Sequence, residues 1–245
     1  MKQENLVRKL NLVLPSFILN IIFVNHYYVK KFTKFVVSQL NKGDKILDAG
    51  AGDSPYKKYF SDFRYHACDL KVGDDSCNYS GLDFECNLER IPVQSNSYDA
   101  IICYNVLEHV PYPNKVIAEF NRILKNNGKL FMVVAQEWKV HQAPHNYFNF
   151  TKYGLNLLLN DGGFKVNYIK EGGGYFHYMS TRISESTSIY FHYMKGIFSS
   201  MLLFPFLILH GLIFSIIFPV LLFPLDFLDR ERTHTSNIFA YASKI

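Results

Sequence analysis

Short apolar runs alternate with helix-like segments through the middle of the chain, and this alternation restricts the possible folds. The runs are KILDAGA (45–51), RYHACDL (64–70), YDAIICYN (98–105) and GKLFMVVAQ (128–136). Before the last run, residues 113–128 place apolar side chains at helical spacing and end in Asn-Gly. Continuous apolar strands separated by helices indicate a parallel sheet covered on both faces, so we expect an α/β fold with a doubly wound, mostly parallel sheet.

The composition narrows the class of partner. The chain has 245 residues, of which 49% are hydrophobic and 16% aromatic, and this suggests apolar surface beyond the needs of one core. The formal net charge is +5, but the lysines are mostly dispersed, which disfavours nucleic acid as a partner. The four cysteines lack zinc-ligand or CxxC spacing, so we interpret them as reduced thiols and expect no metal site.

A glycine turn follows the first apolar run, at Asp48-Ala-Gly50-Ala-Gly52. Such a turn between a strand and a helix lets the backbone approach a ligand closely. The dinucleotide fingerprint has glycine or alanine three residues further on, where this chain has Pro55, so an oxidoreductase is disfavoured. Asp69 ends the next run, at a position where a carboxylate can accept the hydroxyls of a ribose.

Together with YDAIICYNVLEHVPYPNKVIAEFNRILKNNGKLFMVV (98–134), these motifs resemble the class I S-adenosylmethionine-dependent methyltransferases, particularly the type 11-like group. The resemblance covers about residues 45–170. It implies a Rossmann-like sheet of seven strands, with FKVNYIKEG (164–172) and NIFAYASKI (237–245) as the last two, and S-adenosyl-L-methionine as cofactor.

The resemblance also implies the cofactor residues. It places Gly50 and Gly52 against the cofactor, Asp48 as the residue that orders the loop, and Asp69 on the ribose. It assigns three further residues: the adenine contacts are Asn87, where many relatives have Asp, and Leu88, and the residue beside the methionine end is Asn105. From the residues alone, Asp48 could instead cap the turn, and Asp69 could be a solvated strand end.

Three histidines are candidates for a catalytic base. His109 follows the run at 98–105, while His141 and His145 lie in the loop after residue 136, near Tyr147. Methyl transfer from a sulfonium needs no metal, but a hydroxyl acceptor needs a base to take its proton. His109 could equally be a hydrogen-bonded structural residue. Some relatives have Asp and Arg in this loop where this chain has Asn146 and Asn149.

An apolar segment interrupts the end of the fold. Residues 196–225 contain no Asp, Glu, Lys or Arg. Because both ends return to one sheet, the segment can cross a bilayer only an even number of times, and two crossings need about 40 apolar residues. We therefore expect a re-entrant or interfacial hairpin bent at its prolines, or a helical subdomain against another subunit, and favour the membrane.

These observations predict four parts: an N-terminal helical cap (1–40), a methyltransferase core (41–175), an apolar membrane-associated insertion (176–236) and a final core strand (237–245). The predicted function is methyl transfer to a lipid-borne or other membrane-associated small acceptor. We expect it on the cytoplasmic face of the membrane, as a peripheral or monotopic protein, and the sequence does not indicate an oligomeric state. The alternative is a non-catalytic cofactor-binding or scaffold protein on the same fold.

Overall fold

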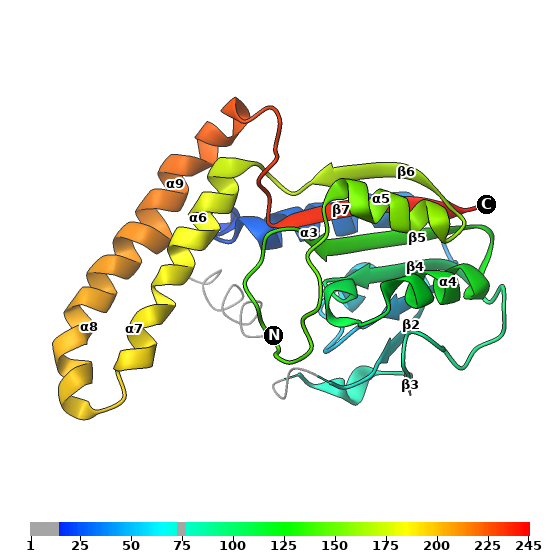
Figure 1. The fold of residues 1–245 in the computed structure, drawn as a ribbon, viewed down its shortest axis with the longest axis horizontal. Helices are drawn as coiled ribbons and strands as arrows, with labels where there is room; N and C mark the ends of the chain where they lie inside the picture. Colours follow the sequence, from blue (N-terminus) through cyan, green and yellow to red (C-terminus); the bar gives the residue numbers. More distant parts are fainter. Residues whose placement is uncertain (1–14, 73–76) are drawn as a thin grey trace. The chain divides into compact units, whose positions relative to one another are not determined.

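The computed structural model describes residues 15–72 and 77–245, and their strands form one sheet of seven in the order β3-β2-β1-β4-β5-β7-β6 (Figure 1). Strands β1 to β5 pair in parallel, and β7 is antiparallel to both of its neighbours, so β6 runs in the same direction as β1 to β5. This confirms the predicted fold class, including its last two strands. The strands are β1 (Lys45–Ala49), β2 (Arg64–Asp69), β3 (Phe84–Glu85), β4 (Tyr98–Tyr104), β5 (Leu124–Ala135), β6 (Phe164–Glu171) and β7 (Asn237–Lys244).

Helices cover both faces of the sheet, as the continuous apolar strands require. In Figure 1, α4 (Pro113–Ile123) and α5 (Lys152–Asp161) lie over one face and α3 (Val24–Ser38) over the other. On the first face, Ile117 and Phe120 of α4 and Leu155 of α5 are fully buried in one cluster with strand residues. The helical spacing of these apolar residues is what turns one stripe of each helix toward the sheet.

The second face has an aromatic core. Phe131 of β5 stacks on Tyr241 of β7 with ring centroids 4.7 Å apart. Phe32 of α3 contacts Phe239 at 5.1 Å between centroids and Tyr168 at 6.5 Å. Since alternate residues of β5 point to opposite faces, Leu130 and Met132 join the first core while Phe131 joins this one.

The helix predicted at 113–128 is shorter than its pattern suggested. It ends at Ile123, and β5 begins at once with Leu124, which is fully buried and pairs with Tyr98 of β4. Asn127 takes a positive φ of 61° beside Gly128, where the pairing of β5 with β4 shifts register, so the Asn-Gly pair interrupts the ladder without ending the strand. Tertiary pairing of Leu124 therefore overrides its local helical spacing.

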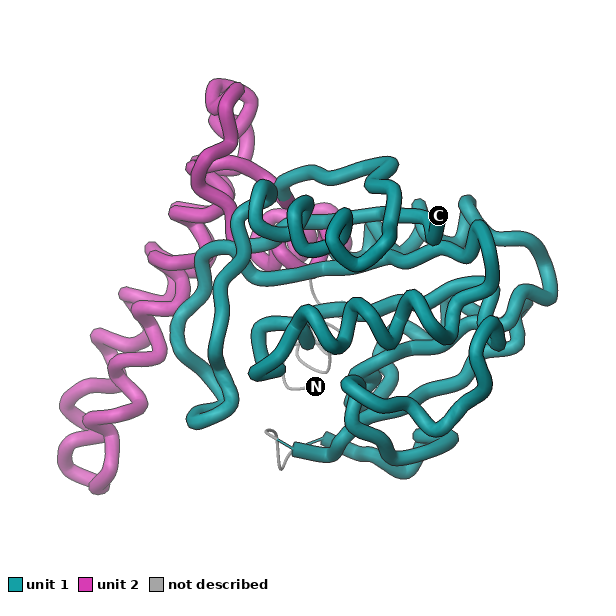
Figure 2. The backbone as a smooth tube through the Cα atoms, turned by 45° about the vertical axis from the view of Figure 1, so that its right-hand side comes forward, with its two compact units in different colours: residues 1–4, 29–171, 237–245 teal, residues 5–28, 172–236 magenta. Residues whose placement is uncertain are grey.

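The chain divides into two compact units (Figure 2). The first holds residues 29–171 and 237–245, which include the whole sheet. The second holds residues 172–236 together with the described part of 5–28. The first part of the predicted N-terminal cap lies outside the described residues. The described remainder consists of α2 (Ser16–Ile22) and α3, and α3 contributes its first residues to the second unit and the rest to the first.

The second unit is a helical hairpin. Its first arm is α6 (Tyr175–Ser186) and α7 (Ser188–Tyr193). Its second arm is one helical run, Ile197–Leu228, made of α8 (Ile197–Leu212), a π-helical turn η4 (Ile213–Ile217), α9 (Phe218–Leu222) and η5 (Phe223–Leu228). The chain reverses at 194–196, between α7 and α8.

The prediction that this segment bends back at its prolines is wrong. Pro205 lies inside α8, while Pro219 and Pro224 fall in the first turns of α9 and η5. Within one continuous run each proline removes a backbone hydrogen bond, and the π-helical turn just before Pro219 changes the hydrogen-bond spacing there without ending the helix. The apolar run therefore continues past its prolines, and its partner in the hairpin is the preceding, more polar arm.

The two-faced core makes a stability prediction. Phe120→Ala should lower the free energy of unfolding by about 3–5 kcal/mol, because Phe120 is fully buried and its loss leaves a cavity. The matched control is Tyr153→Ala on α5, where the ring is 75% exposed and the expected change is within about 0.5 kcal/mol. Urea unfolding in detergent, followed by tryptophan fluorescence, measures both. Equal effects of the two changes would contradict the assignment of Phe120 to the core.

Candidate active site

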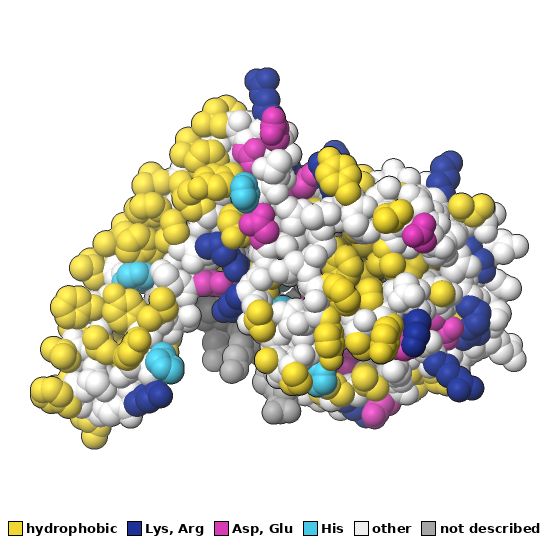
Figure 3. All heavy atoms as spheres, viewed as in Figure 1, with side chains coloured by type: hydrophobic (Ala, Val, Ile, Leu, Met, Phe, Trp, Pro, Cys, Tyr) yellow, Lys and Arg dark blue, Asp and Glu magenta, His cyan; other side chains and the backbone are white. Residues whose placement is uncertain are grey.

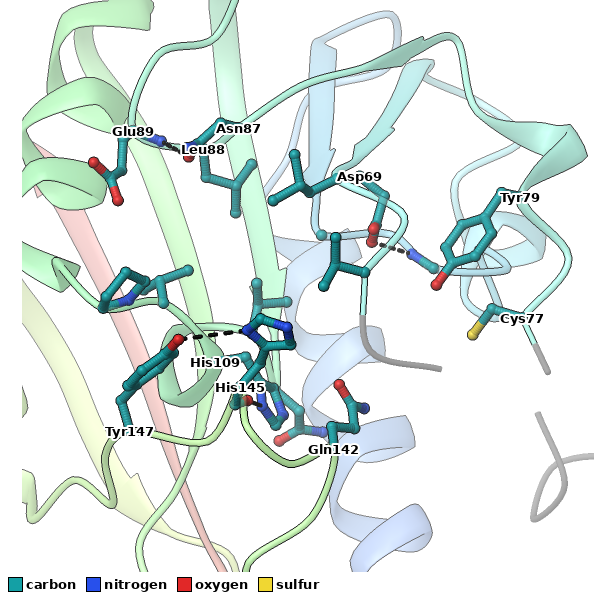
Figure 4. Close-up of a pocket in the computed structure, with 18 residues that line it drawn as sticks. Asp69, Cys77, Tyr79, Asn87, Leu88, Glu89, His109, Gln142, His145 and Tyr147 are labelled. Carbon is teal, nitrogen blue, oxygen red and sulfur yellow. Dashed lines mark hydrogen bonds between the residues drawn. The ribbon is translucent and has the colours of Figure 1, made fainter. Parts of the chain in front are cut away.

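A cavity of about 410 Å³ opens where the glycine turn and the loops after β2, β3, β4 and β5 meet (Figure 4). This volume falls in the range of small-molecule sites, about 300–1,000 Å³. Eight of the ten residues predicted for the site line it or its mouth: Gly50, Gly52, Asp69, Asn87, Leu88, Asn105, His109 and His145. Asp48 and His141 do not line the cavity.

The glycine turn brings the backbone against the cavity. Gly50 has a φ of 78°, and a Cβ added there would lie 2.4 Å from Cγ2 of Val106, so no other residue fits without displacement. The amides of Gly50 and Ala51 both donate to the carbonyl of Cys68, at 2.9 and 3.0 Å. Gly52 also has a positive φ, of 53°. The turn is therefore held to the end of β2 by its own backbone.

The carboxylate of Asp69 is fixed from two sides. Its Oδ2 accepts the amide of Gly52 at 2.9 Å, and its Oδ1 accepts the amide of Lys71 at 2.7 Å. A carboxylate offers about four lone-pair sites, so each oxygen keeps capacity for a further donor. Both oxygens are held at the cavity wall, in a geometry that suits a pair of vicinal hydroxyls.

Asn87 and Leu88 form another side of the cavity. The Oδ1 atom of Asn87 accepts the amide of Glu89 at 2.8 Å, which orients the side-chain NH₂ group away from that amide. Leu88 is 5% exposed and supplies apolar surface. Asn105 follows β4 with a φ of 54°, a conformation that asparagine tolerates better than most residues. An apolar side chain beside an amide is a combination that suits a flat, nitrogen-rich ring.

Asp48 lies behind the turn. It is 5% exposed, and the hydroxyl of Tyr65 donates to its Oδ2. The pKa of Asp48 is raised to about 7, mainly by burial; the Tyr65 hydrogen bond lowers it, and the nearby Asp69 raises it to a smaller extent. The structure thus places Asp48 near the buried end of β1, bonded to Tyr65 and outside the cavity wall.

The charges of the cavity wall point to the class of ligand. The described lining residues include the carboxylates of Asp69 and Glu89 and no lysine or arginine. Pyrophosphate groups are usually bound with cationic side chains or metal ions as well as backbone amides. Glu89 pairs with Lys115 at 3.6 Å, and Lys115 lies outside the lining, so the negative character of the described wall comes mainly from Asp69. A wall without lysine or arginine disfavours a di- or triphosphate and can accommodate a positively charged ligand such as a sulfonium.

His109 is held in one tautomer. Its Nδ1 lies 2.5 Å from the carbonyl oxygen of His145, which can only accept, so Nδ1 carries the hydrogen and Nε2 carries the lone pair. Nε2 is enclosed and receives no hydrogen bond from any described residue. Burial lowers the pKa of His109 most; the hydrogen bond to the His145 carbonyl opposes this, and the neighbouring His141 and His145 rings add to the lowering, so the ring is neutral at pH 7. It therefore has the form that a general base requires.

The loop after β5 is tied to this histidine. The amides of Tyr147 and Phe148 both donate to the carbonyl of Glu108, at 2.8 and 3.3 Å. The Nδ1 atom of His145 lies 3.4 Å from the hydroxyl of Tyr147, and Figure 4 shows His109, His145 and Tyr147 grouped across the cavity from Asp69. His141 stands outside the lining, with its ring centroid 4.6 Å from that of His109.

Some lining residues had no role in the sequence interpretation. Cys77 and Tyr79 lie after β2, on the same side of the cavity as Asp69, and Gln142 lies across from them (Figure 4). The sequence could have indicated these residues only through their position, since they lie in loops that follow the carboxyl ends of predicted strands. Cys68, Cys86 and Cys103 are buried in the core, so Cys77 differs from the other cysteines in facing the cavity.

Glu108 is a buried acid next to His109. It is 1% exposed, and its Oε2 accepts no hydrogen bond from any described residue. Burial raises the pKa of Glu108 to about 7, although backbone amides partly oppose this. Below about pH 4.5 the folded and unfolded states both keep the proton. Between pH 4.5 and 7 only the unfolded state loses it, so the free energy of unfolding falls as the pH rises.

Glu108→Gln should remove this pH dependence. The variant should gain stability over the unmodified protein as the pH rises from 4.5 to 7, by about 3 kcal/mol at pH 8. Urea unfolding at pH 5 and pH 8 measures the difference in free energy of unfolding between the variant and the unmodified protein. The other titrating groups are the same in both proteins, so their contributions cancel in this difference. Glu85→Gln, at an exposed carboxylate, is the control and should show no such trend. A constant difference between the two pH values would show that Glu108 is ionised in the folded protein.

Comparison with known proteins agrees with this geometry. Residues 47–132 match the family model described as a methyltransferase domain. An uncharacterized protein of Methanocaldococcus jannaschii is 34% identical over 134 residues, covering 52% of this chain and 58% of that protein. The ubiquinone/menaquinone biosynthesis C-methyltransferase UbiE of Haemophilus ducreyi is 26% identical over 157 residues, covering 58% and 59%. The chain thus spans less than two thirds of the length of these curated relatives.

Solved structures share the fold. A putative sarcosine dimethylglycine methyltransferase from Galdieria sulphuraria has a TM-score of 0.53 at 14% identity, covering 90% of this chain and 85% of that one. The [4+2]-cyclase SpnF has a TM-score of 0.56 at 15% identity, covering 87% and 80%. The second name shows that the fold alone does not determine the reaction. With the glycine turn, the strand-end carboxylate and the family match, we conclude that the chain carries a class I S-adenosylmethionine-dependent methyltransferase domain.

Proposed function

We propose that the protein transfers a methyl group from S-adenosyl-L-methionine to a lipid-borne or otherwise membrane-associated small acceptor. Acceptors of this class include a glycolipid, a polyprenyl-linked sugar, a quinone precursor and a lipid head group. The observation that carries the proposal is that an apolar helical insertion joins the sheet at the edge where the cavity opens.

The strand register supports the position of the insertion. β6 ends at Glu171, and β7 begins at Asn237, which pairs with Ala135 at the carboxyl end of β5. Because β6 is parallel to β5, both junctions of the insertion lie at the carboxyl edge of the sheet. The cavity is lined by residues from the same edge, including Gly50, Asp69 and Asn105. A membrane contact through the insertion therefore starts from the cofactor edge of the domain.

The relatives support an acceptor from a membrane. UbiE of Haemophilus ducreyi is named for ubiquinone and menaquinone biosynthesis. A second relative, from Nitrosococcus oceani, is named a ubiquinone biosynthesis O-methyltransferase, and it is 25% identical over 152 residues, covering 51% of this chain and 64% of that protein. Quinones of this kind are lipid-soluble, and the apolar insertion gives this chain a direct means of reaching such molecules. We place the protein on the cytoplasmic face of the membrane, where the cofactor is available.

The residues of the cavity fit the cofactor, and each has a proposed task. The bound cofactor supplies an electrophilic methyl group on a sulfonium. Asp69 accepts the ribose hydroxyls, Asn87 and Leu88 hold the adenine, and Asn105 lies by the methionine end. Asp48 supports the turn from behind, and Gly50 and Gly52 let the backbone approach. The protein's main contribution is positioning, since in-line transfer requires the acceptor atom at near-contact distance.

Among the three candidate histidines, His109 is our choice for the base. Its ring lines the cavity, and the His145 carbonyl fixes its lone pair on Nε2. An enclosed acceptor that receives no hydrogen bond from the described residues is unfavourable by about 1–3 kcal/mol. The hydroxyl of an acceptor molecule would satisfy Nε2 once the groups that cover it move aside. His145 supports His109 through its backbone, and His141 packs against the ring from outside the lining.

Cofactor binding tests the assignment of Asp69. Asp69→Ala should weaken the binding of S-adenosyl-L-methionine at least tenfold, because hydrogen bonds to a charged group contribute about 1.5–3 kcal/mol each. Equilibrium dialysis with labelled cofactor measures the effect. The control is Glu85→Ala, since Glu85 pairs with Asp69 in register but does not line the cavity. Unchanged binding by Asp69→Ala, or no binding by the unmodified protein, would contradict the proposal.

Turnover tests His109. The unmodified protein should transfer labelled methyl groups to membrane lipid extracts, and the rate should fall at acid pH as His109 becomes protonated. His109→Gln should bind the cofactor normally, lose about 10²–10⁴-fold in rate and lose this acid limb. His141→Gln and His145→Gln are the matched controls and should keep it. If one of them loses the acid limb instead, His109 is not the base.

The same assays decide between an enzyme and a non-catalytic protein. Because a cyclase shares the fold, cofactor binding alone does not show methyl transfer. Binding without methyl transfer to any fraction of a total membrane extract would favour the cofactor-binding or scaffold alternative. If methyl transfer is observed, mass spectrometry of the extract identifies the acceptor as the molecule that has gained a methyl group.

A further inference from the structure

The second arm of the hairpin presents an apolar surface along its whole length. The run Ile197–Leu228 has 32 residues and a mean hydropathy of 2.6 in its most apolar window, of which only 11% is buried. Ile197, Phe198 and Met201 are 85%, 83% and 74% exposed. Figure 3 shows the apolar side chains gathered along α8 and α9. A core helix would be mostly buried, and a signal sequence would lie near the N-terminus, so neither explains this helix.

Two polar side chains in the middle of the run, His210 and Ser215, face the first arm instead. Thr187 lies 3.2 Å from Nδ1 of His210 and 3.0 Å from the hydroxyl of Ser215. The hydroxyl of Ser184 donates to the carbonyl of Phe214 at 3.0 Å, and Ser186 lies 3.4 Å from Nε2 of His210. We call these residues the polar seam: Ser184, Ser186, Thr187, His210 and Ser215. The seam joins the two arms by hydrogen bonds from side chains.

This polarity is inverted relative to a helix pair in water. In a soluble helix pair, apolar side chains meet at the interface and polar ones face the solvent. Here the interface is hydroxyl-rich and the outside of the second arm is apolar, which is the arrangement of helices whose solvent is lipid. A second protein chain fits less well, because protein interfaces carry a polar rim and about one hydrogen bond per 100–200 Å². The occupant that this surface suits is hydrocarbon.

The first arm is not apolar on all of its sides. Arg182 and Glu185 of α6 form an ion pair at 3.2 Å, and their side chains are 22% and 27% exposed. A charged residue at the centre of a membrane-spanning helix costs about 2.5–3.5 kcal/mol by insertion scales. The second arm is also about 48 Å long at 1.5 Å per residue, against about 30 Å of hydrocarbon, so it fits better along the membrane than upright in it.

The two arms are fastened at their base by buried polar contacts. Asp226 of η5 is 3% exposed, accepts the amides of Gly174 and His177 at 3.0 Å, and lies 3.1 Å from Nδ1 of His177. Asp229 accepts the amide of Tyr175 at 2.7 Å. These contacts hold the start of the first arm to the end of the second, so the hairpin acts as one body.

We propose that the hairpin is a monotopic anchor that lies along one leaflet. The exposed face of Ile197–Leu228 enters the hydrocarbon, while the largely covered ion pair of Arg182 and Glu185 on α6 stays outside it. The polar seam keeps the arms together at the boundary. This inference rests on the proposed membrane association and adds its geometry: one leaflet is entered, the far side is never reached, and neutral lipid is sufficient.

Labelling from one side tests the geometry. The full chain with Cys77→Ser and Lys195→Cys is added to preformed vesicles of neutral phosphatidylcholine, and a membrane-impermeant maleimide is applied outside. Lys195 lies at the reversal between the arms, so it should label fully from outside. Protection until the vesicles are permeabilised would show that the tip crosses the bilayer and would overturn the proposal. Tyr153→Cys on α5, at a 75% exposed position, is the control for labelling from outside.

Flotation tests the lipid contact. The unmodified protein should float with neutral vesicles in 1 M salt, because the contact is hydrophobic rather than ionic. Leu202→Asp with Leu209→Asp, at positions 61% and 56% exposed, should lower the bound fraction at least tenfold. Leu157→Asp on α5, at a 62% exposed position, is the matched control and should not.

Three results would overturn the anchor: flotation that needs anionic lipid and fails in salt, flotation unchanged in the double variant, or failure to float together with a stable dimer in sedimentation. Cofactor binding is measured on the same samples. Lost flotation with retained binding of S-adenosyl-L-methionine in the unmodified protein would reject the anchor and leave the methyltransferase assignment standing.

Discussion

The antiparallel strand β7 determines at which edge of the sheet the hairpin is connected. It pairs with β5 on one side and β6 on the other, so β6 runs parallel to the rest of the sheet and ends at the carboxyl edge. An insertion between β6 and β7 must therefore leave and return at that edge, where the glycine turn and the loops after β2 and β4 already form a cavity. Because β7 is antiparallel, the apolar hairpin is inserted into the chain at the same edge of the sheet as the cavity.

The cavity combines rigid and unsatisfied groups. Backbone amides fix both oxygens of Asp69, and the carbonyl of His145 fixes the tautomer of His109. Beside these, Nε2 of His109 and Oε2 of Glu108 are enclosed and accept no hydrogen bond from the described residues. Unpaired buried acceptors are unfavourable, and they persist where a binding partner or a proton completes them. We interpret Nε2 of His109 as the atom that would accept a hydrogen bond from the hydroxyl of the acceptor molecule. We interpret Glu108 as protonated in the folded protein.

The second unit reverses the usual distribution of polar and apolar side chains. Its hydroxyls and His210 meet between the arms, and its Phe, Leu and Ile side chains face outward. The ion pair of Arg182 and Glu185 confines this character to one side of the hairpin. The apolar face of the second arm favours contact with lipid, whereas moving Arg182 and Glu185 into the hydrocarbon would be unfavourable because charged groups would be desolvated. The two effects together favour a helix pair that lies at the membrane–water interface.

By itself, the sequence determined the α/β fold class and the glycine turn followed by Asp69, because period, glycine positions and strand ends are local properties. The resemblance to a known family added the seven strands and the remaining cofactor residues. Gly50, Gly52, Asp69, Asn87, Leu88 and Asn105 were predicted together, and the fold brings them to one cavity. Only the tertiary structure decided that α4 ends at Ile123 and that the apolar run continues past its prolines. It also decided that Nε2 of His109 accepts no hydrogen bond from the described residues, and that His141 stands outside the lining. Each of these depends on contacts between residues distant in the chain: Leu124 with Tyr98, the polar seam between the arms, and the carbonyl of His145. The spacing of residues along the sequence does not predict contacts of this kind.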